Sequence, residues 1–143
     1  MTNYKVTEVG PLDAWGSLSG VAPGKEFVEG ALGNEFIGLS INSTEPGDTS
    51  PFWHVHHKIE EIYVFLEGEG QMALDDNVID VGPGTVVRVG QGVWRAVRCT
   101  PTSGTPMKWL CIRAGRDTLA DIGNDADLDQ ERAWPWDYGA GQA

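Results

Sequence analysis

The three histidines of the chain lie within four residues, at His54, His56 and His57, and two carboxylates, Glu60 and Glu61, follow them. Side chains two residues apart on a β-strand point to the same face, so His54 and His56 face one way if this stretch is extended. Two imidazoles and one carboxylate on a shared face can hold Fe(II), and similar nitrogen and oxygen sites suit Mn, Zn or Ni. The alternative is a histidine pair that is simply packed or hydrogen-bonded within a strand.

A single arginine in an apolar run is the second candidate for chemistry. Arg95 shares its strand face with Val93, Val97 and Cys99, so the face is otherwise apolar. A charge on an inward apolar face is costly unless it is paired and hydrogen-bonded. Three interpretations are open: an ion pair with Glu61, a bidentate grip on a bound anion such as a carboxylate or phosphate, or a solvated place at the rim.

Short strands must position these residues. Nineteen glycines punctuate the chain, and six segments rich in β-branched and aromatic residues run between turn signals, at 35–41, 61–66, 71–74, 85–89, 93–99 and 107–113. Residues 75–77 and 101–104 have the composition of hairpin turns. Short strands at about ten-residue spacing predict a β-sandwich or a β-barrel. The fold class is therefore all-β.

The segment 61–66 predicts how one strand is covered. Its odd-numbered positions hold Glu61, Tyr63 and Phe65, and its even-numbered positions hold three aliphatic residues. Both faces are largely apolar, so both should be covered. The interior can cover one face, and a second sheet, the N-terminal segment or a partner subunit must cover the other. We therefore expect a homodimer.

The spacing Gly47-x6-His54-x-His56-x4-Glu61-x6-Gly68 resembles the first motif of the cupin superfamily, which places glycines on both sides of a His-x-His and a glutamate. The resemblance covers about residues 35–113. It implies a single jelly-roll β-barrel with a metal ion or ligand inside, here with a short N-terminal segment and an acidic, aromatic C-terminal tail. By this resemblance, His54, His56 and Glu61 are the metal ligands.

The second cupin motif differs in this chain. Cupins usually show Pro-x-Gly-x-x-His-x3-Asn, whereas residues 90–95 read GQGVWR, and Cys99 stands at the asparagine position. Arg95 thus replaces the usual fourth ligand, and a guanidinium has no lone pair for a metal. Three protein ligands still make a facial triad. The expected cofactor is one divalent metal ion, which could be Fe, Zn, Mn or Ni.

Cupins of this size include dioxygenases, isomerases, epimerases and decarboxylases, so the resemblance leaves the reaction open. We expect a dioxygenase or an isomerase or epimerase that acts on a small anionic or polar molecule. Glu61 and Arg95 are the expected catalytic residues, and Arg95, Tyr63, Phe65 and Cys99 are expected to line the pocket. The alternative is a metal-free binding or structural module with an internal Glu61–Arg95 pair.

Composition limits the partners. The chain of 143 residues has 10 basic and 21 acidic side chains, and its net charge of −11 disfavours nucleic acid and anionic membranes as partners. A small-molecule ligand remains compatible with this charge. The two cysteines make a disulfide scaffold improbable. No run approaches the ~20 apolar residues of a membrane span, and the N-terminus lacks the apolar run of a signal peptide. We expect a cytoplasmic protein.

The C-terminal part changes character. Residues 1–116 should form the barrel, and residues 117–143 should form an extension that packs on it, with seven acids, one arginine and a final group of three aromatic residues. The Asp-x-Asp-x-Asp run at 125–129 resembles the start of a calcium loop, but Gln130 and Trp136 stand where that loop needs glycine and glutamate. A solvated acidic segment with an aromatic anchor is the interpretation that remains.

Overall fold

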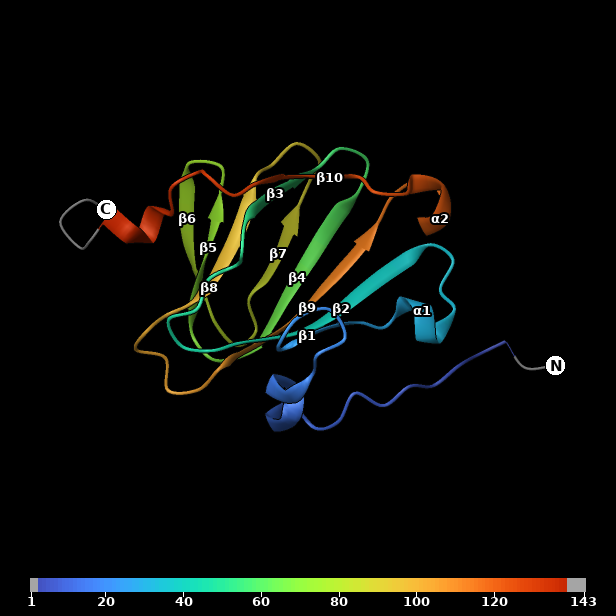
Figure 1. Cartoon of the computed structure of the whole chain (residues 1–143), viewed down its shortest axis with the longest axis horizontal. Coiled ribbons are helices and arrows are strands. Elements are labelled where there is room, and N and C mark those ends of the chain that lie inside the picture. The colour runs from blue at the N-terminus through green and yellow to red at the C-terminus, as the bar shows by residue number, and fades with distance from the viewer. Residues whose placement is uncertain (1–2, 139–143) are drawn as a thin grey trace.

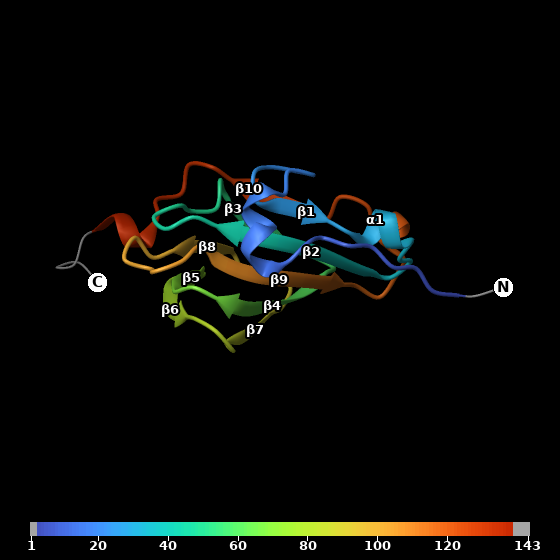
Figure 2. The same cartoon turned by 90° about the horizontal axis from the view of Figure 1, so that it is seen from below.

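The computed structural model describes residues 3–138, and over this range the chain folds into two five-stranded antiparallel sheets that pack face to face (Figures 1 and 2). The first sheet has the order β1 (Lys25–Phe27), β2 (Ile37–Thr44), β9 (Met107–Ala114), β4 (Glu60–Glu67), β7 (Val86–Val89). The second has the order β10 (Ala126–Asp129), β3 (Trp53–His56), β8 (Arg95–Cys99), β5 (Gly70–Leu74), β6 (Asn77–Val81). The all-β prediction is confirmed.

Helical structure in the described part is limited to four short segments: the 3₁₀ helix η1 (Leu12–Ser17), α1 (Glu29–Leu32), α2 (Leu119–Ile122) and the 3₁₀ helix η2 (Pro135–Tyr138). None of them has the length and apolarity that a membrane crossing requires. Trp15 of η1 packs against Val28 and Ile41, so the N-terminal segment covers part of the outer face of the first sheet. Strand β1 pairs with β2 at the edge of the same sheet, and Figure 2 shows η1 as the blue coil next to β1 and β2.

The main hydrophobic core lies between the sheets, and β4 shows how alternation builds it. Tyr63 and Phe65 point inward and are buried. The opposite face of β4 is only partly covered, because Ile62 keeps 40% and Leu66 38% of its surface exposed. The parity expected for this strand is therefore observed. The homodimer that would cover the outer face stays a prediction.

All six predicted segments overlap a strand, and β3 is the extended stretch considered for His54 and His56, whereas strands β1, β6 and β10 were not foreseen. The turn from β4 to β5 depends on Gly68, which has a φ of +83°. A Cβ at this position would lie 2.7 Å from Met107 Cα, so both the backbone conformation and the close approach of β9 require glycine. This turn fixes the end of the strand that carries Glu61.

Candidate metal centre

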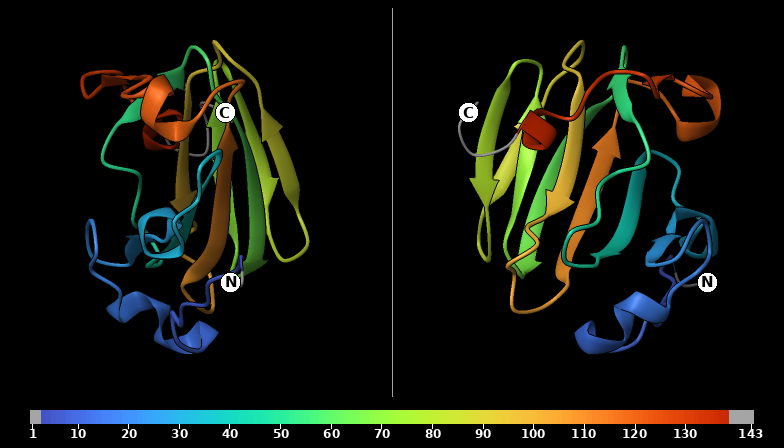
Figure 3. Two further views of the ribbon diagram at one scale, coloured as in Figure 1. Left: turned by 90° about the vertical axis from the view of Figure 1, so that its right-hand side faces the viewer. Right: turned by 60° about the vertical axis from the view of Figure 1, so that its left-hand side comes forward.

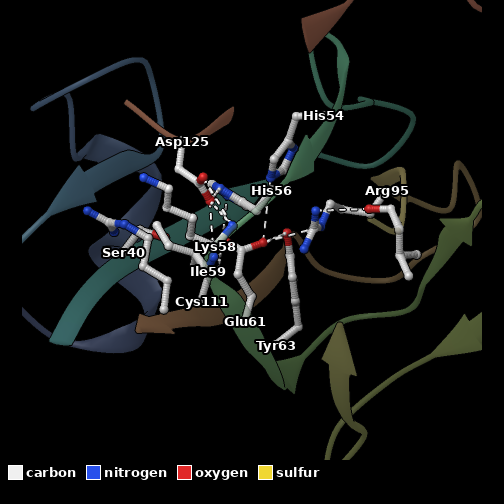
Figure 4. A network of polar contacts seen from close by, with 12 residues as sticks. Ser40, His54, His56, Lys58, Ile59, Glu61, Tyr63, Arg95, Cys111 and Asp125 are labelled. Atoms are coloured by element: carbon white, nitrogen blue, oxygen red, sulfur yellow. Dashed lines mark hydrogen bonds and ion pairs between the residues drawn. The ribbon is translucent and has the colours of Figure 1, made fainter. Parts of the chain in front are cut away.

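Three strands bring the candidate ligands and Arg95 together. His54 and His56 project from the same face of β3, and the β3–β8 register places His54 directly opposite Arg95. Residues directly opposite in an antiparallel pair share a face, so these side chains point to the same side of the second sheet. Glu61 reaches the same point from β4 in the first sheet. Figure 4 shows the four side chains pointing toward one another between the sheets.

The donor atoms have a spacing that suits one metal ion. His54 Nε2 lies 3.5 Å from Glu61 Oε1, and His56 Nε2 lies 3.4 Å from Glu61 Oε2. One donor atom from each of the three residues lies within 4.8 Å of the others. Ligands at about 2.1 Å from a tetrahedral ion are separated by about 3.4 Å, so the two Glu61 distances match that geometry. The residues present therefore fit a divalent ion.

Glu61 is also the centre of a polar network that reaches beyond the histidines. Its Oε1 atom accepts a hydrogen bond from the Tyr63 hydroxyl at 2.9 Å and lies 3.3 Å from Arg95 Nε. Its Oε2 atom accepts a hydrogen bond from the Cys111 thiol, with Sγ at 3.2 Å. With the two histidines of β3 included, groups from β3, β4, β8 and β9 contact the two carboxylate oxygens. The position of the carboxylate is therefore well defined before any ligand binds.

These contacts determine the charge of the site. Burial raises the pKa of Glu61. The contacts with His54 and His56 and the charge of Arg95 lower it by more than burial raises it, so the net pKa lies well below its ordinary value. Glu61 is therefore ionised at neutral pH. Burial lowers the pKa of His54, and the nearby Arg95 and His56 lower it as well, so the net pKa falls although Glu61 raises it. A neutral imidazole keeps a lone pair available for a metal.

The two neighbouring donors stay protonated. Burial raises the pKa of Tyr63, and the nearby Cys111 and Glu61 raise it further. Burial likewise raises the pKa of the Cys111 thiol, and the negative charge of Glu61 adds to the effect. Both groups can therefore donate to Glu61 throughout the neutral range, and neither has the character of an activated nucleophile.

The sequence profile of the Cupin domain family matches residues 42–113, which is just over half of the chain. The chain belongs to the Cupin domain family. No curated protein matches this cupin. The matched range contains all three candidate ligands and Arg95, while β1, α2 and β10 lie outside it.

Solved structures support the same fold. A cupin protein from Bacteroides fragilis is 28% identical, with a TM-score of 0.69 over 81% of this chain and 87% of its own. A double-stranded β-helix protein from Klebsiella pneumoniae is 16% identical, with a TM-score of 0.65 over 88% and 100%. A DMSP lyase from Ruegeria pomeroyi is 23% identical, with a TM-score of 0.54 over 69% of this chain and 46% of that protein. The jelly-roll prediction is confirmed.

Arg95 is fully buried in this cupin, so the interpretation that places it solvated at the rim is wrong. Its Nη1 atom donates to the Val93 carbonyl at 2.9 Å. Within residues 3–138, neither Nε nor Nη2 makes a hydrogen bond of good geometry, although Nε faces Glu61. A buried guanidinium with spare donors is suited to an additional acceptor, because buried polar groups are nearly always hydrogen-bonded.

The other predicted pocket residues divide into two groups. Tyr63 joins the cluster, whereas Phe65 and Cys99 lie among the apolar side chains of the core. The Cys99 thiol faces the carbonyls of Thr100 and Thr105 instead of the histidines. His57 is exposed, and its Nε2 lies 2.7 Å from Asp127 Oδ2. It takes no part in the cluster.

Two residues at the site escaped sequence analysis. The Cys111 thiol contacts Glu61, although no sequence motif links the two residues. Asp125 was grouped with solvated acids of the tail, but its side chain is buried and lies 3.4 Å from His56 Nδ1. Cys111 could have been found from face parity, since it shares its face of β9 with Trp109 and pairs with Tyr63. The position of Asp125 has no local sequence signal.

Proposed function

We propose that this cupin binds a divalent metal ion through His54, His56 and Glu61 and acts on a small anionic molecule next to it. The observation that supports the proposal is the convergence of three donor atoms from two sheets on one buried point. Neutral imidazoles and an ionised carboxylate are the protonation states that a metal ligand needs. When bound, the ion supplies Lewis-acid or redox chemistry, as in a dioxygenase or an isomerase.

Charge favours an anionic ligand. With neutral histidines, Glu61 and Arg95 cancel each other, so a divalent ion leaves a buried space with positive charge that Asp125 behind His56 offsets only in part. Burying net charge is costly unless a counter-charge accompanies it. The spare donor of Arg95, Nη2, lies on the same side chain that contacts Glu61. A carboxylate or phosphate could accept from this guanidinium and balance the charge of the site.

The chain supplies orientation and proton control around this position. Tyr63 and Cys111 hold Glu61 in place, and Tyr63 offers a hydroxyl whose raised pKa keeps it protonated. The sheets exclude bulk water from the carboxylate, which strengthens its interactions with positive charge. Arg95 fixes the anionic group of the ligand, and Glu61 is the only carboxylate of the three candidate ligands.

Metal content tests the proposal. Protein purified without chelators and reconstituted with Fe, Mn, Ni or Zn should contain about one ion per chain by elemental analysis, and EDTA should lower its Tm. His54→Ala should retain less than ~0.2 ion. His57→Ala is the matched control, since His57 contacts Asp127 instead of the cluster, and should retain the ion. Equal metal content in the two variants would count against this site.

The same structure supports a second candidate function. Arg95 Nε lies 3.3 Å from Glu61 Oε1 in a buried pair, which is the arrangement expected of a metal-free binding module. In that case the guanidinium, not a metal ion, neutralises Glu61, and the histidines would hydrogen-bond the ligand directly. A wild-type protein that takes up none of the four metals and whose Tm is insensitive to EDTA would favour this alternative.

A further inference from the structure

The acidic run at 125–129 lies against the strand that carries the histidines. Strand β10 pairs with β3 in antiparallel register, with Ala126 opposite His56 and Leu128 opposite His54. This segment lies outside the range matched by the Cupin domain profile. Its three aspartates have different surroundings: Asp129 caps a local turn, Asp127 contacts the exposed His57, and Asp125 is buried.

Asp125 holds the turn between the two strands that supply all three candidate metal ligands. Its Oδ2 atom accepts from the backbone N–H groups of His57 at 3.1 Å, Lys58 at 2.9 Å and Ile59 at 3.0 Å, and Oδ1 also accepts from Lys58 at 3.1 Å. These three residues connect β3 to β4. Their position sets how His56 on one strand lies relative to Glu61 on the next.

The same carboxylate lies behind the His56 ring. Asp125 Oδ2 is 3.4 Å from Nδ1, while Nε2 on the other side of the ring is 3.4 Å from Glu61. Figure 4 shows His56 between the two carboxylates. Within the described residues His56 Nδ1 is buried and makes no hydrogen bond of good geometry, so Asp125 is the acceptor within reach. A movement of about 0.5 Å would bring the pair to hydrogen-bond distance.

We propose that Asp125 is a positioning residue of the metal site, which holds His56 with Nδ1 protonated and Nε2 directed toward Glu61. This inference rests on the proposed function of His54, His56 and Glu61. A metal-binding histidine commonly donates its second nitrogen to a carboxylate, which fixes the tautomer and makes the ring a better ligand. In this chain the carboxylate comes from the C-terminal extension, so the extension completes the site.

The first measurement uses wild-type, metal-free protein. Side-chain ¹⁵N NMR should show a proton on Nδ1 of His56, whether or not Nε2 also carries one toward Glu61, whereas a ring protonated on Nε2 alone would overturn the inference. This readout requires no variant, so it stands even if substitution of Asp125 impairs folding. It also separates a role toward the imidazole from a role in the turn alone, because a purely structural clamp leaves the tautomer free.

The second measurement compares Zn²⁺ affinity by calorimetry for wild type, Asp125→Asn and Asp127→Asn. Asp127→Asn removes the same charge from the same acidic run but affects only the exposed His57. We expect Kd to rise about tenfold for Asp125→Asn and less than about twofold for the control. Equal Kd values for wild type and a folded Asp125→Asn would overturn the inference alone. Failure of wild type to bind Zn²⁺, Mn²⁺, Ni²⁺ or Fe²⁺ would overturn the metal proposal and the inference with it.

Discussion

Arg95 Nε and Glu61 Oε1 lie 3.3 Å apart across the interior, one from each sheet, with 0% and 4% of their side chains exposed. Each side chain is therefore the oppositely charged partner of the other. A buried pair of this kind contributes little net stability relative to apolar residues, but removing one partner leaves an uncompensated charge. The pair thus couples the electrostatics of any bound ion to the stability of the fold.

Arg95→Met separates the two roles of this pair. Without metal, the variant should lose about 3–5 kcal/mol of unfolding free energy, because Glu61 remains buried and ionised without its partner. A divalent ion can then replace the missing charge, so Zn²⁺ should raise the Tm of Arg95→Met by more than that of wild type. Thermal melts with and without Zn²⁺ measure this difference. Equal shifts would mean that Arg95 does not affect the ion.

Tyr63→Phe removes one donor to Glu61 and changes little else. The Tyr63 hydroxyl donates to a buried carboxylate at 2.9 Å, and hydrogen bonds to charged groups contribute about 1.5–3 kcal/mol. We expect a loss of about 2 kcal/mol in urea denaturation. Tyr4→Phe is the control, because Tyr4 is exposed, and should change stability by less than about 0.5 kcal/mol. Similar losses in both variants would contradict a specific role for this contact.

Lys25 predicts a pH dependence of stability. Its ammonium donates to Asn42 Oδ1 at 2.8 Å, and burial lowers its pKa. Below the folded-state pKa, the buried ammonium destabilises the folded state to its full extent. This destabilisation disappears as the pH rises toward the pKa of lysine in the unfolded chain, about 10.4. As the pH rises through the lowered folded-state pKa toward about 10, the unfolding free energy of wild type should therefore rise relative to that of Lys25→Met.

Urea titrations at several pH values give the wild-type minus variant difference, in which the titration of groups that do not interact with Lys25 cancels. Lys5→Met, at an exposed position, should give a difference that does not change with pH. A flat difference for Lys25→Met would show that this lysine keeps an ordinary affinity for its proton in the folded state.

Trp134 joins the C-terminal extension to the second sheet. Its ring stacks on Trp53 at 5.9 Å and on Trp136 at 5.8 Å between centroids. The right-hand view of Figure 3 shows the end of the extension along this side of the molecule. Trp134→Ala should lower the unfolding free energy by about 2 kcal/mol in a urea denaturation followed by far-UV circular dichroism. The exposed Leu128 gives the control Leu128→Ala, which should be nearly neutral. A neutral Trp134→Ala would show that the stack does not hold the extension.

The outer face of β4 bears on oligomeric state. We predict a homodimer that covers Ile62 and Leu66, so light scattering at micromolar concentration should give twice the mass of the chain. Ile62→Lys should shift the protein to monomer, because a charge in an apolar interface is costly. Val78→Lys on β6, where exposure is 42% against 40% for Ile62, should leave the mass unchanged. A monomeric wild type would refute this prediction.

The sequence predicted most of the barrel because alternation is a local property. In β4, the odd positions Glu61, Tyr63 and Phe65 are buried as their parity requires. Strand β10, with the sequence ADLD, carries no such pattern of β-branched residues, and it forms because β3 offers an edge to pair with. Its existence depends on tertiary context, which overrides local propensity.

The sequence predicted only those site residues whose spacing along the chain places them together. His54 and His56 share a face by period two, and Glu61 follows at a short distance along the chain. The proximity of Arg95 to Glu61 depends on the register of β3 with β8, which no short-range pattern specifies. Asp125 lies 66 residues from Ile59 in the sequence and accepts a hydrogen bond from its N–H group. A contact over that distance requires the folded chain.

Strand β10 also affects the tendency of the protein to aggregate. A free sheet edge presents unpaired N–H and C=O groups, to which a strand of another molecule can add. β10 covers that edge of β3 and becomes the edge itself, with Asp127 and Asp129 along it. Like charges on an edge strand oppose pairing with a second copy. The extension therefore protects the histidine strand against edge-to-edge aggregation, and a cupin shortened before residue 125 should lose colloidal stability.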